Sequence, residues 1–411
     1  MTTMKERQRR CYRKFVVCLL GFLLCLPLVS FVSISQGEDV KEVRVGVILP
    51  LSGPVSATGN RFMNMYEFTF NEVNAAGGIK SLGGAKLKLL KGDSESKSDV
   101  GMTAAEKLIN EGAVVLMGAF QSDVTFVASQ VAENRKTPFI CETSASERIA
   151  SRGFKYLFKI SPDFPTFIRC WYKYFDDYGK KTGVKAKRIA LINENTLFGK
   201  SNYESFQNLL PKDYELMVEF FPRGTPDLTS ELTKIKAWKP DIIHHCGYVD
   251  DAVLIRRTMR EINLKPMIYI SAPAGQDPKY TKTLGDLAEF TVINGEWAPD
   301  IKKAGVAEVN AKYKKVYGED MFAQQGEVYA AIYVLKDALE RAASIDKEKV
   351  RKALSETRLT NHLLPRRVIR FDEAGKDPDA TSMALQIIQG KYYTIWPSEF
   401  ASKEGVWPGK Y

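Results

Sequence analysis

Few residues of this chain have the types and spacing that catalysis requires. Beyond its first 37 residues the only histidines are His244, His245 and His362, and no Gly-x-Ser-x-Gly, His-Glu-x-x-His or Gly-x-Gly-x-x-Gly motif is present. In a strand, His244 and Cys246 would point to one side and His245 to the other, and no second cluster completes a metal site. We therefore expect no catalytic residue, no metal and no cofactor, and interpret the His-His-Cys run as strand-end packing or cleft lining.

Gly199-Lys200-Ser201 is similar to the end of a phosphate-binding loop. The glycine that such a loop places five residues before Gly199 is Glu194 here, so the backbone amides that would surround a phosphate are not provided. The start of a helix after a strand explains this run better.

Hydroxyl side chains gather where predicted strands end and helices begin. In open α/β sheets, ligands bind beyond the carboxyl ends of strands, where free backbone N–H groups point outward. The turns of this kind in the first half are Leu51-Ser52-Gly53-Pro54, Asp93-Ser94, Gln121-Ser122-Asp123 and Thr143-Ser144-Ala145-Ser146. They could bind a carboxylate, or Ser122, Asp123, Ser144 and Ser146 could be helix caps contributing about 1 kcal/mol each. The sequence leaves both interpretations open.

The elements that would position these turns follow a repeated pattern. From Val43 onward, β-branched runs alternate with helical patterns, which predicts a mostly parallel sheet with helices on both faces. The alternation starts again after Ser161-Pro162, so we expect two similar α/β halves. The predicted helices are 60–76, 99–110, 122–135, 164–178, 203–210, 228–238, 251–262, 307–317, 326–343 and 347–356, followed by the strand-like runs RRVIRF and MALQIIQ. The short junctions near Ile160 and Val292 suit lobes that hinge about a cleft.

The first 37 residues have the layout of a secretory signal peptide. Six Lys and Arg residues precede an apolar run from Phe15 to Val32, and small polar residues follow. Cleavage after Ser35 or Gly37 is expected, and a retained membrane anchor is the alternative. Removing the segment's six basic residues and Glu6 lowers the formal net charge from +10 to +5, so no nucleic-acid surface need be invoked.

Three cysteines follow the predicted signal peptide. They are Cys141, Cys170 and Cys246, an odd number without Cys-x-x-Cys spacing. At most one internal disulfide can form among them.

Several runs resemble a known family. VGVILPLSGPVSATGN followed by NEVNAAGGIK carries the most specific likeness, and AAEKLINEGAVVLMGAF, RIALINENTLFG and LTKIKAWKPDIIHHCGY add to it. From about Val43 to Tyr393 the chain resembles the periplasmic binding proteins of branched-chain amino acid ABC transporters. The resemblance implies the type I periplasmic-binding fold, an α/β structure of two doubly wound parallel-sheet lobes around a cleft. It implies lobe one at 42–160 and 293–381 and lobe two at 161–292 and 382–411.

The resemblance also implies ligand-binding residues. Ser122 matches the family's carboxylate-binding serine, Thr143 and Ala145 fall in the turn that completes this anchor, and Ser146 is a neighbouring candidate. Phe198 and Tyr248 match cleft aromatics on the second lobe, with core packing as the alternative interpretation.

One position departs from the family pattern. The acidic residue that pairs with the ammonium group of an amino acid falls at Ala274, so that carboxylate is absent. A buried ammonium without a partner costs several kcal/mol, so an amino acid ligand requires a replacement such as Asp250, Gln276 or Glu327. A carboxylate, an amide or an aromatic acid without an amino group becomes a serious candidate.

The resemblance implies a monomeric periplasmic solute-binding protein that captures an amino acid, an amide or an aliphatic or aromatic carboxylate by hinge closure and docks on the membrane subunits of an ABC importer. A ligand-sensing module that signals to a receptor or kinase is the first alternative. An exported enzyme is the second, and the poverty in histidine argues against it.

Overall fold

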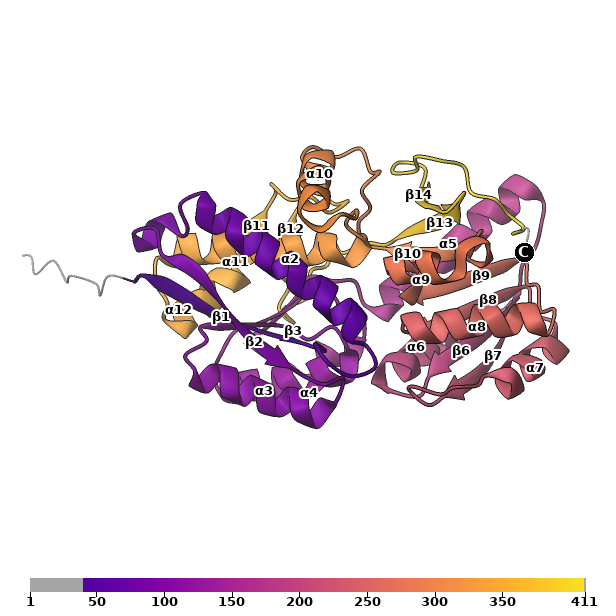
Figure 1. Cartoon of the computed structure of the whole chain (residues 1–411), viewed down its shortest axis with the longest axis horizontal. Helices are drawn as coiled ribbons and strands as arrows, with labels where there is room; N and C mark the ends of the chain where they lie inside the picture. Colours follow the sequence, from indigo (N-terminus) through magenta and orange to yellow (C-terminus); the bar gives the residue numbers. More distant parts are fainter. Residues whose placement is uncertain (1–39, 410–411) are drawn as a thin grey trace, which may run out of the picture. The chain divides into compact units, whose positions relative to one another are not determined.

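Two mostly parallel sheets organise the chain in the computed structural model, which describes residues 40–409 (Figure 1). Sheet one has the strand order β2-β1-β3-β4-β5, and sheet two has the order β14-β13-β10-β9-β8-β6-β7. Numbered from the first strand of each half, the order 2-1-3-4-5 occurs in both, so the two halves repeat one doubly wound topology. The predicted fold class is confirmed.

Sheet one is parallel throughout and lies between two helix layers. Its strands are β1 (Glu42–Leu49), β2 (Lys86–Asp93), β3 (Val115–Gly118), β4 (Phe139–Cys141) and β5 (Leu157–Lys159). Helices α2 (Ser56–Ala75) and α11 (Ala323–Ala342) pack in the core on one face, and α3 (Ser98–Asn110) and α4 (Ser122–Asn134) pack in the core on the other.

Sheet two ends in an antiparallel edge. Its parallel strands are β6 (Arg188–Glu194), β7 (Glu215–Phe221), β8 (Ile242–Gly247), β9 (Ile268–Pro273) and β10 (Val292–Gly295). The antiparallel strands β13 (Met383–Ile388) and β14 (Lys391–Trp396) follow at the edge. Helices α5 (Phe164–Thr182) and α6 (Leu197–Asn208) cover one face, and α7 (Thr229–Trp238), α8 (Val249–Glu261) and α9 (Pro278–Leu284) cover the other.

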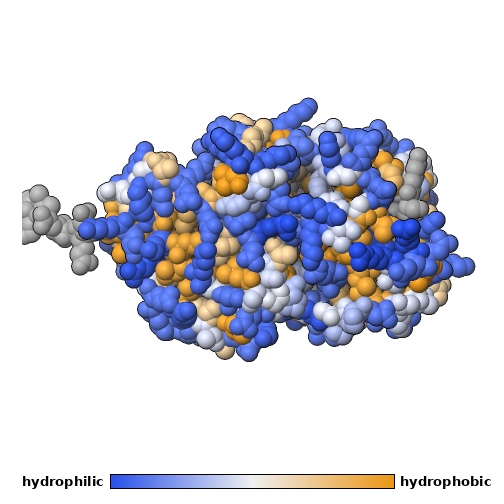
Figure 2. Space-filling model, in the orientation of Figure 1, coloured by the Kyte–Doolittle hydropathy of each residue, from blue (hydrophilic) through white to orange (hydrophobic). Residues whose placement is uncertain are grey.

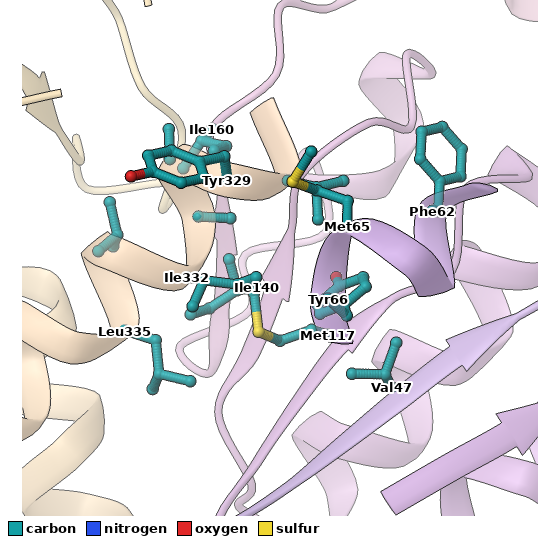
Figure 3. Close-up of a cluster of buried hydrophobic side chains, with 14 of the residues drawn as sticks. Val47, Phe62, Met65, Tyr66, Met117, Ile140, Ile160, Tyr329, Ile332 and Leu335 are labelled. Carbon is teal, nitrogen blue, oxygen red and sulfur yellow. The ribbon is translucent and has the colours of Figure 1, made fainter. Parts of the chain in front are cut away.

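Strand alternation explains how each sheet holds two cores. Val45 and Val47 pack with α2 and α11, whereas Ile48 packs on the side of α3 and α4. In sheet two, Ile189 and Leu191 belong to one core, and Ala190 and Ile192 belong to the other. Figure 3 shows part of the first core, where side chains of α2, α11, β3 and β4 meet: Met65, Tyr66, Ile332, Leu335, Met117 and Ile140.

The chain passes between the two sheets three times. It leaves sheet one after β5, leaves sheet two after β10, and returns to sheet two at β13. Between the last two passages lie α10 (Val306–Tyr317), α11, α12 (Lys347–Ser355), β11 (Arg358–Leu359) and β12 (Ile369–Arg370), and the three helices join the core of sheet one.

The face drawn in Figure 2 is mainly hydrophilic, with separate hydrophobic patches between charged residues. Within residues 40–409, no helix is long and apolar enough to span a membrane.

Cys141, Cys170 and Cys246 are free thiols, and burial raises the pKa of Cys141 to about 11.

Two glycines bring a helix against the end of the preceding strand, one in each half. A Cβ atom on Gly59 of α2 would lie 2.0 Å from the carbonyl oxygen of Pro50, and one on Gly199 of α6 would lie 2.0 Å from that of Glu194. Both distances are too short for any side chain. Only glycine therefore lets α6 approach β6 as it does.

We expect Gly199→Ala to lower the free energy of unfolding by about 1–3 kcal/mol, because the new methyl group displaces α6 from β6 and this cost exceeds the gain in helix propensity of about 1 kcal/mol. Urea denaturation measures the change. Lys200→Ala, an exposed position on the same helix, is the control and should stay within about 0.5 kcal/mol of the unmodified protein. Equal stability of Gly199→Ala and the control would contradict this account of α6.

Candidate functional site

A cavity lies at the carboxyl ends of strands from both sheets. Its walls come from the turns after β3 and β4, from α5 and α6, from the ends of β8, β9 and β10, and from the start of α11. The aromatic lining residues are Phe120, Phe164, Phe167, Trp171, Phe198 and Tyr248. The polar lining residues are Thr143, Asn202, His244, Asn294, Glu296 and Gln324. The cavity encloses about 20 Å³, enough for about one water molecule.

Thr143 and Ala145 are the predicted sheet-one residues that line the cavity. The Thr143 side chain is buried, and its hydroxyl has no hydrogen-bond partner among the described residues. A buried hydroxyl without a partner costs free energy, so it is ready to donate to an acceptor in the cavity. Thr143 is therefore a hydrogen-bond donor in the cavity wall.

Ser122 and Ser146 are buried behind that wall. The Ser122 hydroxyl accepts a hydrogen bond from the Ser146 backbone N–H at 3.4 Å, and the Ser146 and Ser201 hydroxyls are 2.7 Å apart. Ser144 lies 2.6 Å from the Thr125 hydroxyl and donates to the carbonyl of Phe120 at 3.0 Å.

The interpretation of these residues as helix caps does not hold. Gln121 is the N-cap of α4 and makes no side-chain cap hydrogen bond, and neither does Ser146 before the short helix that follows it. Asp123 forms an ion pair with Arg223 instead. The hydroxyls hold one turn against another, and this fixes the segment that presents Thr143 and Ala145.

The two predicted aromatics, Phe198 and Tyr248, line the cavity from the side of sheet two. Their rings are stacked with centroids 5.7 Å apart, and the Tyr248 ring meets Phe120 of the sheet-one side edge-on at 5.5 Å. Both are also buried in the main hydrophobic core, so cavity lining and core packing apply together. These rings supply an apolar wall for a ligand side chain.

Asn202 was not predicted, although it lies four residues after Phe198 on the same helix face. Its side-chain oxygen accepts from Asn193 at 3.1 Å, which leaves its buried Nδ2 group without a partner among residues 40–409. Asn202 is thus a second donor in the wall.

Asn294 and Glu296 were also missed. They are two residues apart at the end of β10, so strand alternation places both side chains on the same side. This spacing is visible in the sequence just after the predicted junction near Val292. Asn294 donates to Glu296 at 2.9 Å, and its own buried oxygen has no partner in the described part of the chain. The end of β10 therefore adds acceptors to the wall.

His244 lines the cavity, in agreement with the expectation of strand-end packing or cleft lining. Its ring forms T-shaped contacts with Trp171 and Phe206, and burial lowers its pKa to about 3, so the imidazole is neutral at pH 7. His245 points away from it and stacks on Phe221 in the opposite core. Among the described residues, no group of three or more His, Cys, Asp or Glu side chains is placed to hold a metal ion.

Ala274 lies outside the cavity wall. It is buried among Val249, Ala252 and Tyr280, and the neighbouring Ala272 and Pro273 line the cavity instead. The three suggested replacements also differ in location. Asp250 is exposed and pairs with Lys279, and Gln276 and Glu327 are buried outside the wall.

Arg223 joins the two sides next to the cavity. From the loop after β7 it donates to Glu194 at 2.8 and 3.0 Å, to Asp123 of α4 at 3.2 and 3.3 Å, and to the Ser96 carbonyl at 3.0 Å. Its guanidinium carbon lies 5.6 Å from the Tyr248 ring centroid. One arginine thus connects two elements of the sheet-one side to a strand of sheet two.

The comparisons with known proteins agree on one family. The family model described as periplasmic binding protein matches residues 42–391. A relative in Brucella suis, named Leu/Ile/Val-binding protein homolog 7, is 25% identical over 379 residues, covering 88% of this chain and 93% of that protein.

Solved structures share the fold. The leucine binding protein LivK of Thermotoga maritima has a TM-score of 0.77 at 22% identity and covers 86% of this chain and 97% of its own. The branched-chain amino acid transporter substrate binding protein LivJ of Streptococcus pneumoniae, in complex with isoleucine, has a TM-score of 0.75 at 18% identity and covers 87% and 100%.

A double-mutant cycle should show how strongly the two sides are coupled at Arg223. We expect a coupling energy of about 1 kcal/mol or more between Arg223→Ala and Asp123→Ala, because both side chains are only about one-fifth exposed and the contact is bidentate. Urea denaturation of the four proteins gives this value and cancels the cost of leaving Glu194 unpaired.

The pair Arg148 and Glu204 is the matched control, since it joins the same two sides with side chains 49% and 35% exposed. Its coupling should be at most about 0.5 kcal/mol. Similar values for both pairs would show that Arg223 is no stronger a connection than a surface ion pair.

Proposed function

Because the chain belongs to the periplasmic binding protein family, we propose that it is the extracytoplasmic solute-binding protein of an ABC importer. It captures a small amino-acid-like or carboxylated ligand between two lobes. The observation that carries this proposal is the cavity at the strand ends of both sheets, whose wall contains hydrogen-bonding groups without protein partners. Binding a small molecule satisfies such groups.

The two lobes of the proposal are residues 42–160 with 293–381, and residues 161–292 with 382–411. Each contains one sheet, except that residues 293–295 of β10 fall within the bounds of the first lobe but pair in sheet two, and three passages of the chain connect the lobes. With about 20 Å³ of space, the cavity admits no amino acid, so a ligand enters only when the lobes separate and is enclosed when they close. Three chain segments that connect the lobes permit such a hinge.

The cavity wall supports the proposed ligand class. The Thr143 hydroxyl, the Asn202 amide and the Ala145 backbone provide the polar contacts for a carboxylate, and Phe198 and Tyr248 cover an apolar side chain. Ser122 and Ser146 support the turn that carries Thr143. The relatives bear names that refer to leucine, isoleucine and valine, which fits this combination.

The proposal includes location and partners. Residues 1–37, a predicted signal peptide, lie outside the described residues, and their removal would deliver a monomer to the periplasm. The closed form would then dock on the membrane subunits of the importer. Its role is to bind and deliver rather than to transform the ligand.

The first test is a thermal-shift screen of the exported protein against branched-chain and aromatic amino acids, amides, and aliphatic and aromatic acids. A ligand that binds only the folded state raises the melting temperature, so at least one carboxylated compound should do so in a concentration-dependent way. Matched methyl esters, which lack the carboxylate charge, are the control. No shift with any carboxylated compound would contradict the proposal.

We expect Thr143→Ala to weaken the binding of every carboxylated ligand about tenfold or more, because a hydrogen bond to a charged group is lost. Isothermal titration calorimetry measures the affinity. Thr143→Ser keeps the hydroxyl and should bind like the unmodified protein. If Ser122→Ala costs more than Thr143→Ala, the carboxylate anchor is at Ser122 instead.

A further inference from the structure

Among residues 40–409, Glu296 is the only carboxylate that lines the cavity, and no Lys or Arg of this range lines it. The residue is 2% exposed. Its oxygens accept hydrogen bonds from two neutral amides, Asn294 at 2.9 Å and Gln276 at 3.2 Å. None of the ion pairs found within residues 40–409 includes Glu296, so its negative charge lacks a direct partner.

Lys159 is the cation whose charge lowers the pKa of Glu296, but it donates its hydrogen bonds to other groups. Its ammonium donates three hydrogen bonds, to the carbonyl of Ser161 at 2.7 Å, to the Ser161 hydroxyl at 2.9 Å and to the carbonyl of Pro162 at 2.9 Å. An ammonium group has three donors, so none remains for Glu296. Lys159 attracts Glu296 only through space.

A second buried carboxyl group, that of Glu327, lies behind the wall. Glu327 of α11 is fully buried, and neither of its oxygens has a hydrogen-bond partner among the described residues. Burial and then the charge of Glu296 raise the pKa of Glu327, while Arg366 and Lys159 lower it. Burial raises the pKa of Glu296 itself to about 7, against the hydrogen bonds from Gln276 and Asn294 and the attraction of Lys159.

We propose that Glu296 binds the ammonium group of the ligand and thereby selects zwitterionic amino acids over acids that lack an amino group. The unpartnered Asn294 oxygen beside it provides a second acceptor, and the unpartnered Thr143 and Asn202 donors bind the carboxylate. A buried ammonium requires such a partner, because its desolvation is otherwise uncompensated. This inference rests on the proposed solute-binding function and names its substrate class.

The test compares ligands that differ only in the amino group. Calorimetry measures the affinities of L-leucine and 4-methylpentanoate, and of L-phenylalanine and 3-phenylpropanoate, for the unmodified protein, Glu296→Gln and Glu327→Gln. In at least one pair, the unmodified protein should prefer the amino acid at least about tenfold. Glu296→Gln should weaken that amino acid about 30-fold or more and its deaminated analogue less than about threefold.

Glu327→Gln is the matched control. It also removes a buried carboxylate, but one outside the cavity wall, so the preference for the amino acid should remain. Thr143→Ala should weaken both members of a pair equally. The unfolding midpoint of each variant checks that it is folded. If Glu296→Gln does not fold, Glu296→Asp takes its place, because its side chain is one methylene shorter and holds the carboxylate farther from the ligand. It should weaken the binding of the amino acid and leave the binding of the deaminated analogue unchanged.

Three results would overturn the inference while leaving solute binding intact: a preference of the unmodified protein for the deaminated acids, an equal effect of Glu296→Gln on both members of a pair, or no effect on either. Binding of none of the four compounds would overturn both the inference and the proposed ligand class. The failure of one proposal is therefore distinguishable from the failure of the other.

Discussion

Parallel strands all end at the same edge of their sheet, and the rest of this molecule depends on that constraint. Each half repeats one strand order, so each has one edge where strands end and helices begin. The cavity lies where these edges of both sheets contribute residues. Residues far apart in sequence, such as Thr143 after β4 and Glu296 after β10, therefore line one space. Neither half alone could enclose a ligand there.

Much of the fold could be predicted because its signals are local. The β-branched runs and the helical periodicity give the alternation, and most predicted helices begin within a few residues of the observed ones. The apolar periodicity predicted helix α6 only through Tyr203 to Leu210, whereas the helix begins at Leu197, close to the helix start predicted at Gly199-Lys200-Ser201. Strands β5, β10, β11 and β14 were not predicted, since the first three have four residues or fewer and β14 forms an antiparallel edge outside the βα pattern.

The candidate site could be predicted only in part. Thr143 and Ala145 lie in the cavity wall, in a turn after a strand where the topology places ligands, and Phe198 and Tyr248, which the family resemblance implied, lie there as well. Strand alternation places Glu296 on the same side as Asn294, but what this side faces depends on how the chain passes between the sheets. The sequence therefore does not identify Glu296 as a wall residue. The sequence alone therefore locates the apolar half of the wall better than its ionic half.

The bridge made by Arg223 also bears on how fast a bound molecule can leave. Its contacts with Asp123 and the Ser96 carbonyl are made between protein atoms alone, so under the proposed function they would favour the closed form whatever occupies the cavity. A stronger bridge enlarges the fraction of molecules already able to hold a ligand, which tightens the apparent affinity for all ligands by one factor. Under the proposed function, the same bridge would have to break before the ligand is released. Arg223 would then affect both how tightly a ligand is held and how fast it is released, without contacting the ligand.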